Sequence, residues 1–148
     1  MPRFYWDFRS MRQAHREGST PFTPAVTAFY GLDAALELME QEGREAIFAR
    51  HARAGDLVRE QVLELGLELF ADPPYNSNTV TAIKVPKGMV ANEIRDALRV
   101  NYNTIIAGGL GRYTNSVLRI GHLGFFTEED LTRTIEQLGA VIKRLGGS

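Results

Sequence analysis

Apolar side chains that recur every three or four residues predict two long helices in the first half of the chain. The first helix is expected to begin at Thr23-Pro24, because threonine caps a helix well and proline is tolerated at the first helical position. Its apolar stripe comprises Val26, Phe29, Tyr30, Ala34, Leu36 and Leu38. Gly43 interrupts the pattern, and a second helix is expected from there to Gly66.

Beyond Gly66 the apolar runs become shorter and richer in β-branched residues, which indicates strands. Strands are predicted over 67–70, 79–85, 104–107 and 117–120, with a helix over 91–102 between the second and the third. A last helix is expected after Thr127, because that cap precedes three acidic residues and an apolar stripe from Leu131 to Leu145. This order predicts an α+β fold: a two-layer sandwich in which a small, mostly antiparallel sheet of about four strands carries helices on one face, preceded by the long helix pair.

The first 22 residues show no clean period. Phe4, Tyr5, Trp6 and Phe8 lie close together and are followed by a polar stretch. We therefore expect residues 1–22 to be an irregular segment that packs on the rest of the chain or on a missing neighbour, and residues 23–148 to form one compact domain.

Composition narrows the class of function. The 148 residues are 44% hydrophobic and 24% charged with a formal net charge of −1, which is typical of a globular domain and gives no overall field for nucleic acid or an anionic membrane. No apolar run is long enough for a membrane span. The absence of cysteine excludes a disulfide, a thiolate metal site and a thiol nucleophile within this sequence. A cytoplasmic location is the default expectation.

Few motifs carry chemistry. His15, His51 and His122 are far apart and lack a metal-binding spacing, so no metal site is predicted. The glycine run 108–111 follows one predicted strand and precedes another, so it fits neither a P-loop nor a dinucleotide fingerprint. It is either a hairpin connection or a ligand loop.

Arg119 interrupts the apolar strand at 117–120, next to Gly121. In one interpretation, Arg119 and Val117 share the solvent face of a half-exposed strand. In the other, a guanidinium held on a rigid strand binds a carboxylate or phosphate through two parallel hydrogen bonds.

Three segments together resemble a known family: Thr23-Pro24-Ala25-Val26, Gly108-Gly109-Leu110-Gly111 and the stretch Leu118-Arg119-Ile120-Gly121-His122-Leu123-Gly124. Their order and spacing are similar to those in the C-terminal part of class V pyridoxal-phosphate-dependent aminotransferases, in particular the serine–pyruvate/alanine–glyoxylate subgroup. The resemblance implies the small domain of a fold-type I aminotransferase over 23–148, with residues 1–22 at the boundary of a large domain.

The resemblance also implies roles for individual residues. Arg119 falls on the arginine that binds the substrate α-carboxylate, and Gly109 lies in the loop that lines the substrate entrance. Thr23 falls on the threonine that contacts the cofactor phosphate of the partner subunit. The sequence departs from the family pattern at Thr20, where some relatives have a tyrosine, and at Arg112, where relatives often have another residue. His122 is interpreted as a packing residue at a strand end.

In relatives, the lysine that forms the Schiff base with pyridoxal phosphate and the carboxylate that holds the pyridinium nitrogen both lie upstream of the part that this sequence resembles. Lys84, Lys87 and Lys143 are interpreted as surface charges, so no catalytic residue is assigned. The resemblance thus implies that the full-length parent uses pyridoxal 5′-phosphate to transfer an amino group from a small amino acid, of the serine or alanine type, to a 2-oxo acid. The isolated chain is expected to be inactive and to bind no cofactor alone.

The implied partners are a missing N-terminal large domain and a second subunit, since the parent enzymes are homodimers. Two alternatives remain open at this point. The chain is a stand-alone α+β module that binds a small carboxylate through Arg119 and the glycine loop, or it is a dimerisation module that uses the apolar stripe Val26–Leu38 and the aromatic start.

Overall fold

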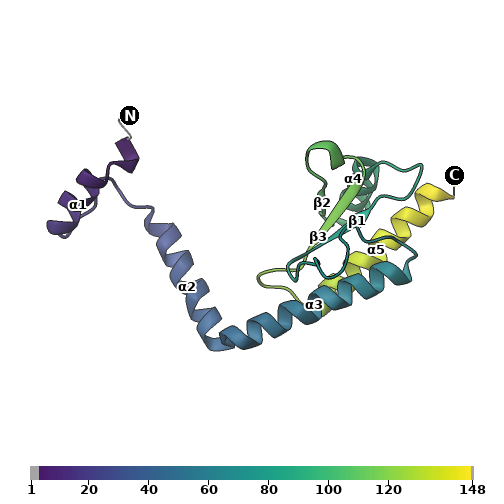
Figure 1. Ribbon diagram of the computed structural model, residues 1–148, viewed down its shortest axis with the longest axis horizontal. Coiled ribbons are helices and arrows are strands. Elements are labelled where there is room, and N and C mark those ends of the chain that lie inside the picture. Colours follow the sequence, from purple (N-terminus) through teal and green to yellow (C-terminus); the bar gives the residue numbers. More distant parts are fainter. Residues whose placement is uncertain (1–3, 148) are drawn as a thin grey trace. The chain divides into compact units, whose positions relative to one another are not determined.

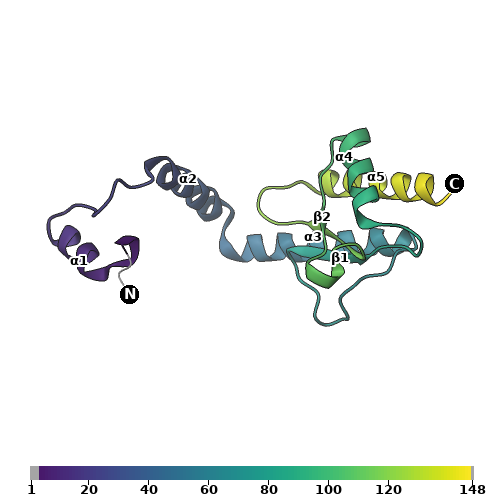
Figure 2. The ribbon, with the colours of Figure 1, turned by 90° about the horizontal axis from the view of Figure 1, so that it is seen from above.

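The computed structural model describes residues 4–147. The chain divides into two compact units, residues 1–44 and 45–148, which are described separately below. Figure 1 labels the helices and strands along the chain, and Figure 2 shows the same ribbon from above.

The first unit is helical. It contains a 3₁₀ helix over Phe4–Trp6 (η1), α1 over Phe8–Arg16 and α2 over Val26–Glu42. The regular helix α1 lies within the segment that was expected to be irregular. Asp7 caps it by accepting a hydrogen bond from the Arg9 backbone N–H at 2.9 Å. No periodic apolar pattern marks this helix, because Ala14 is its only buried residue. The division between residues 1–22 and 23–148 stays a prediction.

Helix α2 begins later than the Thr23-Pro24 pattern predicts. Its N-cap is Ala25, with no side-chain hydrogen bond, so the prediction of Thr23 as the cap is wrong. The chain turns just before the helix, where the Pro24 carbonyl accepts from the Val26 N–H at 2.9 Å. Gly43, with φ of 84°, ends α2 as expected.

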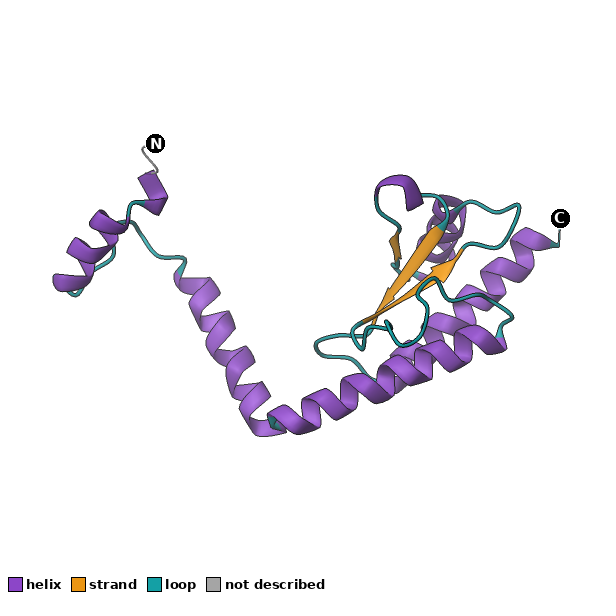
Figure 3. Ribbon diagram, in the orientation of Figure 1, coloured by secondary structure: helices purple, strands orange, loops and turns teal. Residues whose placement is uncertain are grey.

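The second unit is the α+β domain that the sequence predicts. It contains β1 (Val80–Lys84), α4 (Ala91–Tyr102), β2 (Ala107–Gly108), a 3₁₀ helix over Gly111–Tyr113 (η2), β3 (Val117–Gly121) and α5 (Glu128–Gly146). It also holds α3 (Arg44–Glu64) from its second residue onward. The strands form an antiparallel sheet in the order β1-β3-β2, drawn as orange arrows in Figure 3.

Two of the predicted strands are shorter or shifted. The segment 67–70 contributes only a bridge between Leu69 and Ile83, because Leu67 still bonds back to Val62 at the end of α3. The strand expected at 104–107 is found at Ala107–Gly108. Thr104 instead completes the end of α4, where its N–H bonds to the Leu98 carbonyl at 3.3 Å.

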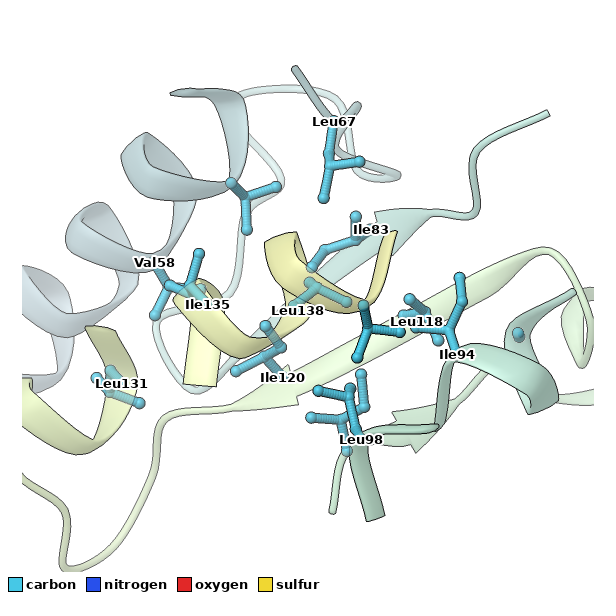
Figure 4. Close-up of a cluster of buried hydrophobic side chains, with 14 of the residues drawn as sticks. Val58, Leu67, Ile83, Ile94, Leu98, Leu118, Ile120, Leu131, Ile135 and Leu138 are labelled. Atoms are coloured by element: carbon cyan, nitrogen blue, oxygen red, sulfur yellow. The ribbon is translucent and has the colours of Figure 1, made fainter. Parts of the chain in front are cut away.

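One face of the sheet carries the core. Side chains from β1 and β3 meet apolar side chains of α3, α4 and α5, as the close-up in Figure 4 shows. The fully buried members include Val58, Ile83, Ile94, Leu98, Leu118 and Leu138. Gln61 and Thr132 also join α3 to α5 by a hydrogen bond of 3.1 Å. The helices therefore cover one face of the sheet, which leaves its other face for a site.

Helix α5 shows the cap that the sequence predicts. The Thr127 hydroxyl accepts from the Asp130 N–H, and the Asp130 carboxylate accepts from the Thr127 N–H, so the two residues form a capping box. In the part of the chain that the structure describes, none of the helices combines the length and apolarity that a membrane crossing requires.

Candidate functional site

Arg119 lies in the middle of β3, on the face of the sheet opposite the helices. Its neighbours Leu118 and Ile120 are buried in the core, and side chains alternate between faces along a strand. Arg119 pairs with Ala82 of β1 on one side and with Ala107 of β2 on the other. Because both neighbours have small side chains, the guanidinium is flanked by little bulk on this face.

The side chain of Arg119 is held in place by a single hydrogen bond. Its Nε donates to the Gly108 carbonyl at 2.7 Å, and the residue is half-buried. Among residues 4–147, no carboxylate forms an ion pair with Arg119, and its terminal guanidinium nitrogens have no hydrogen-bond partner. A guanidinium fixed through Nε still presents both terminal nitrogens, which can donate to a carboxylate.

The glycine run forms part of a hairpin. β2 and β3 are antiparallel neighbours, and residues 109–116 connect them through η2. The connection is longer than a tight turn, and Gly111 in it adopts φ of 54°. The glycine loop and Arg119 therefore come together, as the carboxylate-site interpretation requires.

Gly109 has a structural reason to be glycine. Its N–H donates to the Val117 carbonyl at 2.8 Å, so that group is already used within the hairpin. A Cβ at this position would lie 2.1 Å from the Tyr113 carbonyl oxygen, a distance no side chain tolerates. The geometry of the turn is thus sufficient to explain why residue 109 is a glycine. The role of Gly109 in substrate binding stays a prediction.

An aromatic pair that the sequence did not predict joins the hairpin connection to the segment beside β1. The rings of Phe70 and Tyr113 make an edge contact with centroids 4.9 Å apart, and the Arg112 guanidinium lies 4.7 Å from the Tyr113 ring centroid. Phe70 bonds through its N–H to the Ala82 carbonyl, which places it across β1 from Arg119. No sequence signal links these residues, because they meet only through the sheet register.

His122 is a buried structural residue next to the site. It is fully inaccessible, and its Nε2 lies 2.9 Å from Thr81 Oγ1 while its Nδ1 lies 3.1 Å from the Asn78 carbonyl. A carbonyl only accepts, so Nδ1 carries the proton and Nε2 accepts from the Thr81 hydroxyl. Burial lowers the pKa of His122, although the bond to Asn78 opposes this shift.

Thr23 lies in the first unit, and its position relative to Arg119 is not defined by the structure. It is exposed and lines a shallow concavity together with Tyr5, Thr20, Pro21, Phe22 and Pro24. The rings of Tyr5 and Phe22 pack against each other there, with centroids 4.6 Å apart. The proposed phosphate contact of Thr23 therefore stays a prediction.

The three lysines are exposed, and Lys84 forms an ion pair with Glu68 at 3.0 Å. This ion pair lowers the pKa of the Glu68 carboxyl.

Within the described residues, no group of three histidine, aspartate or glutamate side chains is arranged to hold a metal ion.

Comparison with known proteins finds relatives along nearly the whole chain, although no family model matches it. Serine–glyoxylate aminotransferase of Methylorubrum extorquens is 37% identical over 136 residues, which is 91% of this chain and 34% of that protein. A Synechococcus protein named as the small subunit of a soluble hydrogenase is 38% identical over 99% of this chain and 38% of its own length. The chain thus spans less than two-fifths of the length of these curated relatives.

Comparison with solved structures also identifies aminotransferases. Pyridoxamine–pyruvate aminotransferase from Mesorhizobium loti superposes with a TM-score of 0.81 at 34% sequence identity, covering 85% of this chain and 33% of that one. The matched part has the same small α+β domain as the second unit described above. The chain belongs to the class V aminotransferases and corresponds to a C-terminal portion of them.

Proposed function

We propose that this chain is the small domain of a pyridoxal-phosphate-dependent aminotransferase that transfers an amino group from a small amino acid, of the serine or alanine type, to a 2-oxo acid. In this proposal Arg119 binds the α-carboxylate of the substrate. The observation that carries it is the bond from Arg119 Nε to the Gly108 carbonyl, which holds the guanidinium beside the glycine loop.

The energy of this interaction is modest in the isolated chain. A charge-assisted hydrogen bond to a carboxylate contributes about 1.5–3 kcal/mol, which corresponds to a Kd of the order of 10–100 mM. The guanidinium alone therefore discriminates a carboxylate from a neutral ligand, but it gives little selectivity among amino acids, because all of them carry the same α-carboxylate.

In this proposal, residues 4–147 do not form a cofactor site by themselves. Pyridoxal-phosphate chemistry needs a lysine amine held in a partly desolvated site, whereas Lys84, Lys87 and Lys143 are all exposed and Lys84 is paired with Glu68. We therefore propose that the isolated chain is inactive and that residues outside it complete the site. Thr23, exposed ahead of α2, is proposed to contact the cofactor phosphate of a second subunit.

Exposed apolar surface on the first unit supports the proposed partners, a large N-terminal domain and a second subunit. Helix α2 has no buried residue, and Phe29 and Tyr30 are 63% and 73% exposed. Apolar surface of this extent is typical of a protein interface. The same surface favours the alternative of a dimerisation module. A cytoplasmic location stays part of this proposal.

Carboxylate binding by Arg119 can be tested on the chain itself. We would titrate ¹⁵N-labelled protein with sodium acetate and with L-alanine up to high millimolar concentration and follow the side-chain Nε–H signal of Arg119 by NMR. Binding should shift this signal in the wild type and in Arg99→Met, an exposed arginine variant on α4. Arg119→Met lacks this signal and therefore assigns it, and in this variant the shifts that acetate causes in the Gly108 and Gly109 backbone amides should be lost. A wild type that shows no shift would overturn the proposal.

A turnover assay distinguishes an active aminotransferase from a domain that only binds the substrate carboxylate. The purified chain, mixed with pyridoxal phosphate, L-serine and glyoxylate, is expected to give no detectable 2-oxo acid product from serine. Product formation above the protein-free rate would contradict the proposed inactivity, whereas carboxylate binding without turnover agrees with a domain that supplies only the arginine.

A further inference from the structure

β2 is an edge strand whose outward carbonyls need partners. It lies at the end of the sheet order β1-β3-β2, so only one of its sides is paired with another strand. The bond from the Gly109 N–H to the Val117 carbonyl makes Gly108 and Leu118 a non-hydrogen-bonded pair. The Gly108 carbonyl therefore points away from β3, and so does that of Ile106, two residues earlier.

Two arginines donate hydrogen bonds to these outward carbonyls. Arg119 reaches across the outer face of the sheet and donates from Nε to the Gly108 carbonyl at 2.7 Å. Arg95, on α4, donates from Nε to the Ile106 carbonyl at 3.1 Å. The two outward carbonyls of this edge are therefore hydrogen-bonded to guanidinium groups, one from the sheet and one from a helix.

Arg95 is itself fixed in two further ways. Its Nη1 donates to the Asn92 side-chain oxygen at 2.9 Å, one turn earlier on α4. Nη1 also packs against Gly108, where a Cβ would lie 3.4 Å away. Because α4 is anchored by the fully buried Ile94 and Leu98, the backbone of Arg95 is held in place beside a strand of only two residues.

We propose that Arg95 is a positioning residue for the carboxylate site. Arg95 donates a hydrogen bond to the Ile106 carbonyl and packs on Gly108, and these contacts fix the position of the Gly108 carbonyl. Because Arg119 Nε donates to that carbonyl, Arg95 also sets the direction in which the terminal nitrogens of Arg119 face a carboxylate. This inference rests on the proposed function of Arg119, but it concerns a residue that touches no substrate.

The test measures Arg119 while Arg95 is changed. In ¹⁵N-labelled chain, the hydrogen-exchange rate of the Arg119 Nε–H reports its bond to Gly108, and an acetate titration reports the apparent Kd. Arg95→Met keeps the length of the side chain but removes its donors. We expect it to speed the exchange about tenfold and to weaken acetate binding several-fold, since one supporting hydrogen bond is lost.

Arg99→Met is the matched control, because it removes the same charge from the same helix. Among residues 4–147 the exposed Arg99 side chain pairs with Asp96 alone, so this variant should leave both quantities within about twofold of the wild type. Asn92→Ala releases the Arg95 guanidinium without touching β2. It should change the exchange rate and the acetate Kd in the same direction as Arg95→Met, but less. It replaces Arg95→Met in the experiment if that variant does not fold.

The outcomes distinguish the two proposals. If acetate moves the Arg119 signal in the wild type, but neither Arg95→Met nor Asn92→Ala changes exchange or binding, the positioning role is wrong and the proposed function stands. If acetate has no effect on the wild type, the proposed function fails. The exchange rates of the variants then still decide whether Arg95 holds the Gly108 carbonyl.

Discussion

Thr81 and His122 face each other in the buried interior, with Thr81 Oγ1 2.9 Å from His122 Nε2. Thr81 lies on β1, and His122 follows directly after β3, so their bond ties together the two longest strands at the end opposite the glycine loop. With Nδ1 protonated, Nε2 accepts from the Thr81 hydroxyl, and protonation of Nε2 would place a charged imidazolium in a buried position, which desolvation disfavours.

Stability should therefore fall as the pH drops through the titration of His122. Burial lowers its pKa below the ordinary value of 6.5, so the unfolded chain takes up the proton first as the pH falls. The contribution of His122 is fully present above about pH 7.5 and is lost progressively from about pH 6.5 downward, until the pH reaches the folded-state pKa. Urea unfolding at several pH values between about 8 and 5 measures this.

His122→Gln removes the ionisable group, so this variant should lose most of the slope that the wild type shows in that range. A free energy of unfolding that rises in the wild type as the pH falls from 7 to 5 would show that the buried imidazole is not neutral.

Gly109→Ala should destabilise the hairpin. The added Cβ would lie 2.1 Å from the Tyr113 carbonyl oxygen, so the backbone of the loop has to move, at a cost of about 1–3 kcal/mol. Gly108→Ala is the neighbouring control. Its Cβ would meet the flexible Arg95 side chain at 3.4 Å, and we expect it to cost less than about 1 kcal/mol. Chemical denaturation of the two variants measures both, and equal costs would contradict the geometry of the loop.

Thr127→Ala should lower the free energy of unfolding by about 1 kcal/mol, within a range of roughly 0.5–2 kcal/mol, because it removes the side-chain half of the capping box of α5. Thr127→Ser keeps the hydroxyl and should stay close to the wild type. Circular dichroism during urea unfolding measures the difference. If serine and alanine destabilise equally, the methyl group of Thr127 matters and the hydroxyl does not.

The sequence allowed prediction of the elements whose local signals are strong. α4 occupies Ala91–Tyr102 as expected, because its apolar spacing is regular and Asn103 ends it in a left-handed conformation. The cap at Thr127 was equally clear. In contrast, Thr23-Pro24 has the composition of a helix start, yet the turn between Pro24 and Val26 delays α2. α1 escaped prediction because almost all its residues are exposed, and an exposed helix needs no apolar stripe.

The site was only partly accessible from the sequence. Arg119 stands out as a charge in an apolar strand. The alternation of side chains along β3 did not show whether its face is exposed, because Val117 lies on the same face and is only 4% exposed. The bond that orients Arg119 goes to a backbone carbonyl of an edge strand, and no residue type marks such a carbonyl. Arg95 was missed for the same reason, because nothing in its local sequence indicates that it supports Ile106 and Gly108.

The apolar surface of α2 should make the isolated chain self-associate. Phe29 is 63% exposed on a helix without buried residues, and burying one such ring contributes about 1.5–3 kcal/mol, or roughly a factor of ten or more in Kd. Phe29→Ser should therefore weaken association measured by sedimentation. Phe125→Ser, the same change at a ring that is 97% exposed in the second unit, should leave it unchanged. A wild type that stays monomeric at high micromolar concentration would show that α2 does not pair with a second copy, and its apolar side chains would then have to be covered by a different partner, such as the proposed large domain.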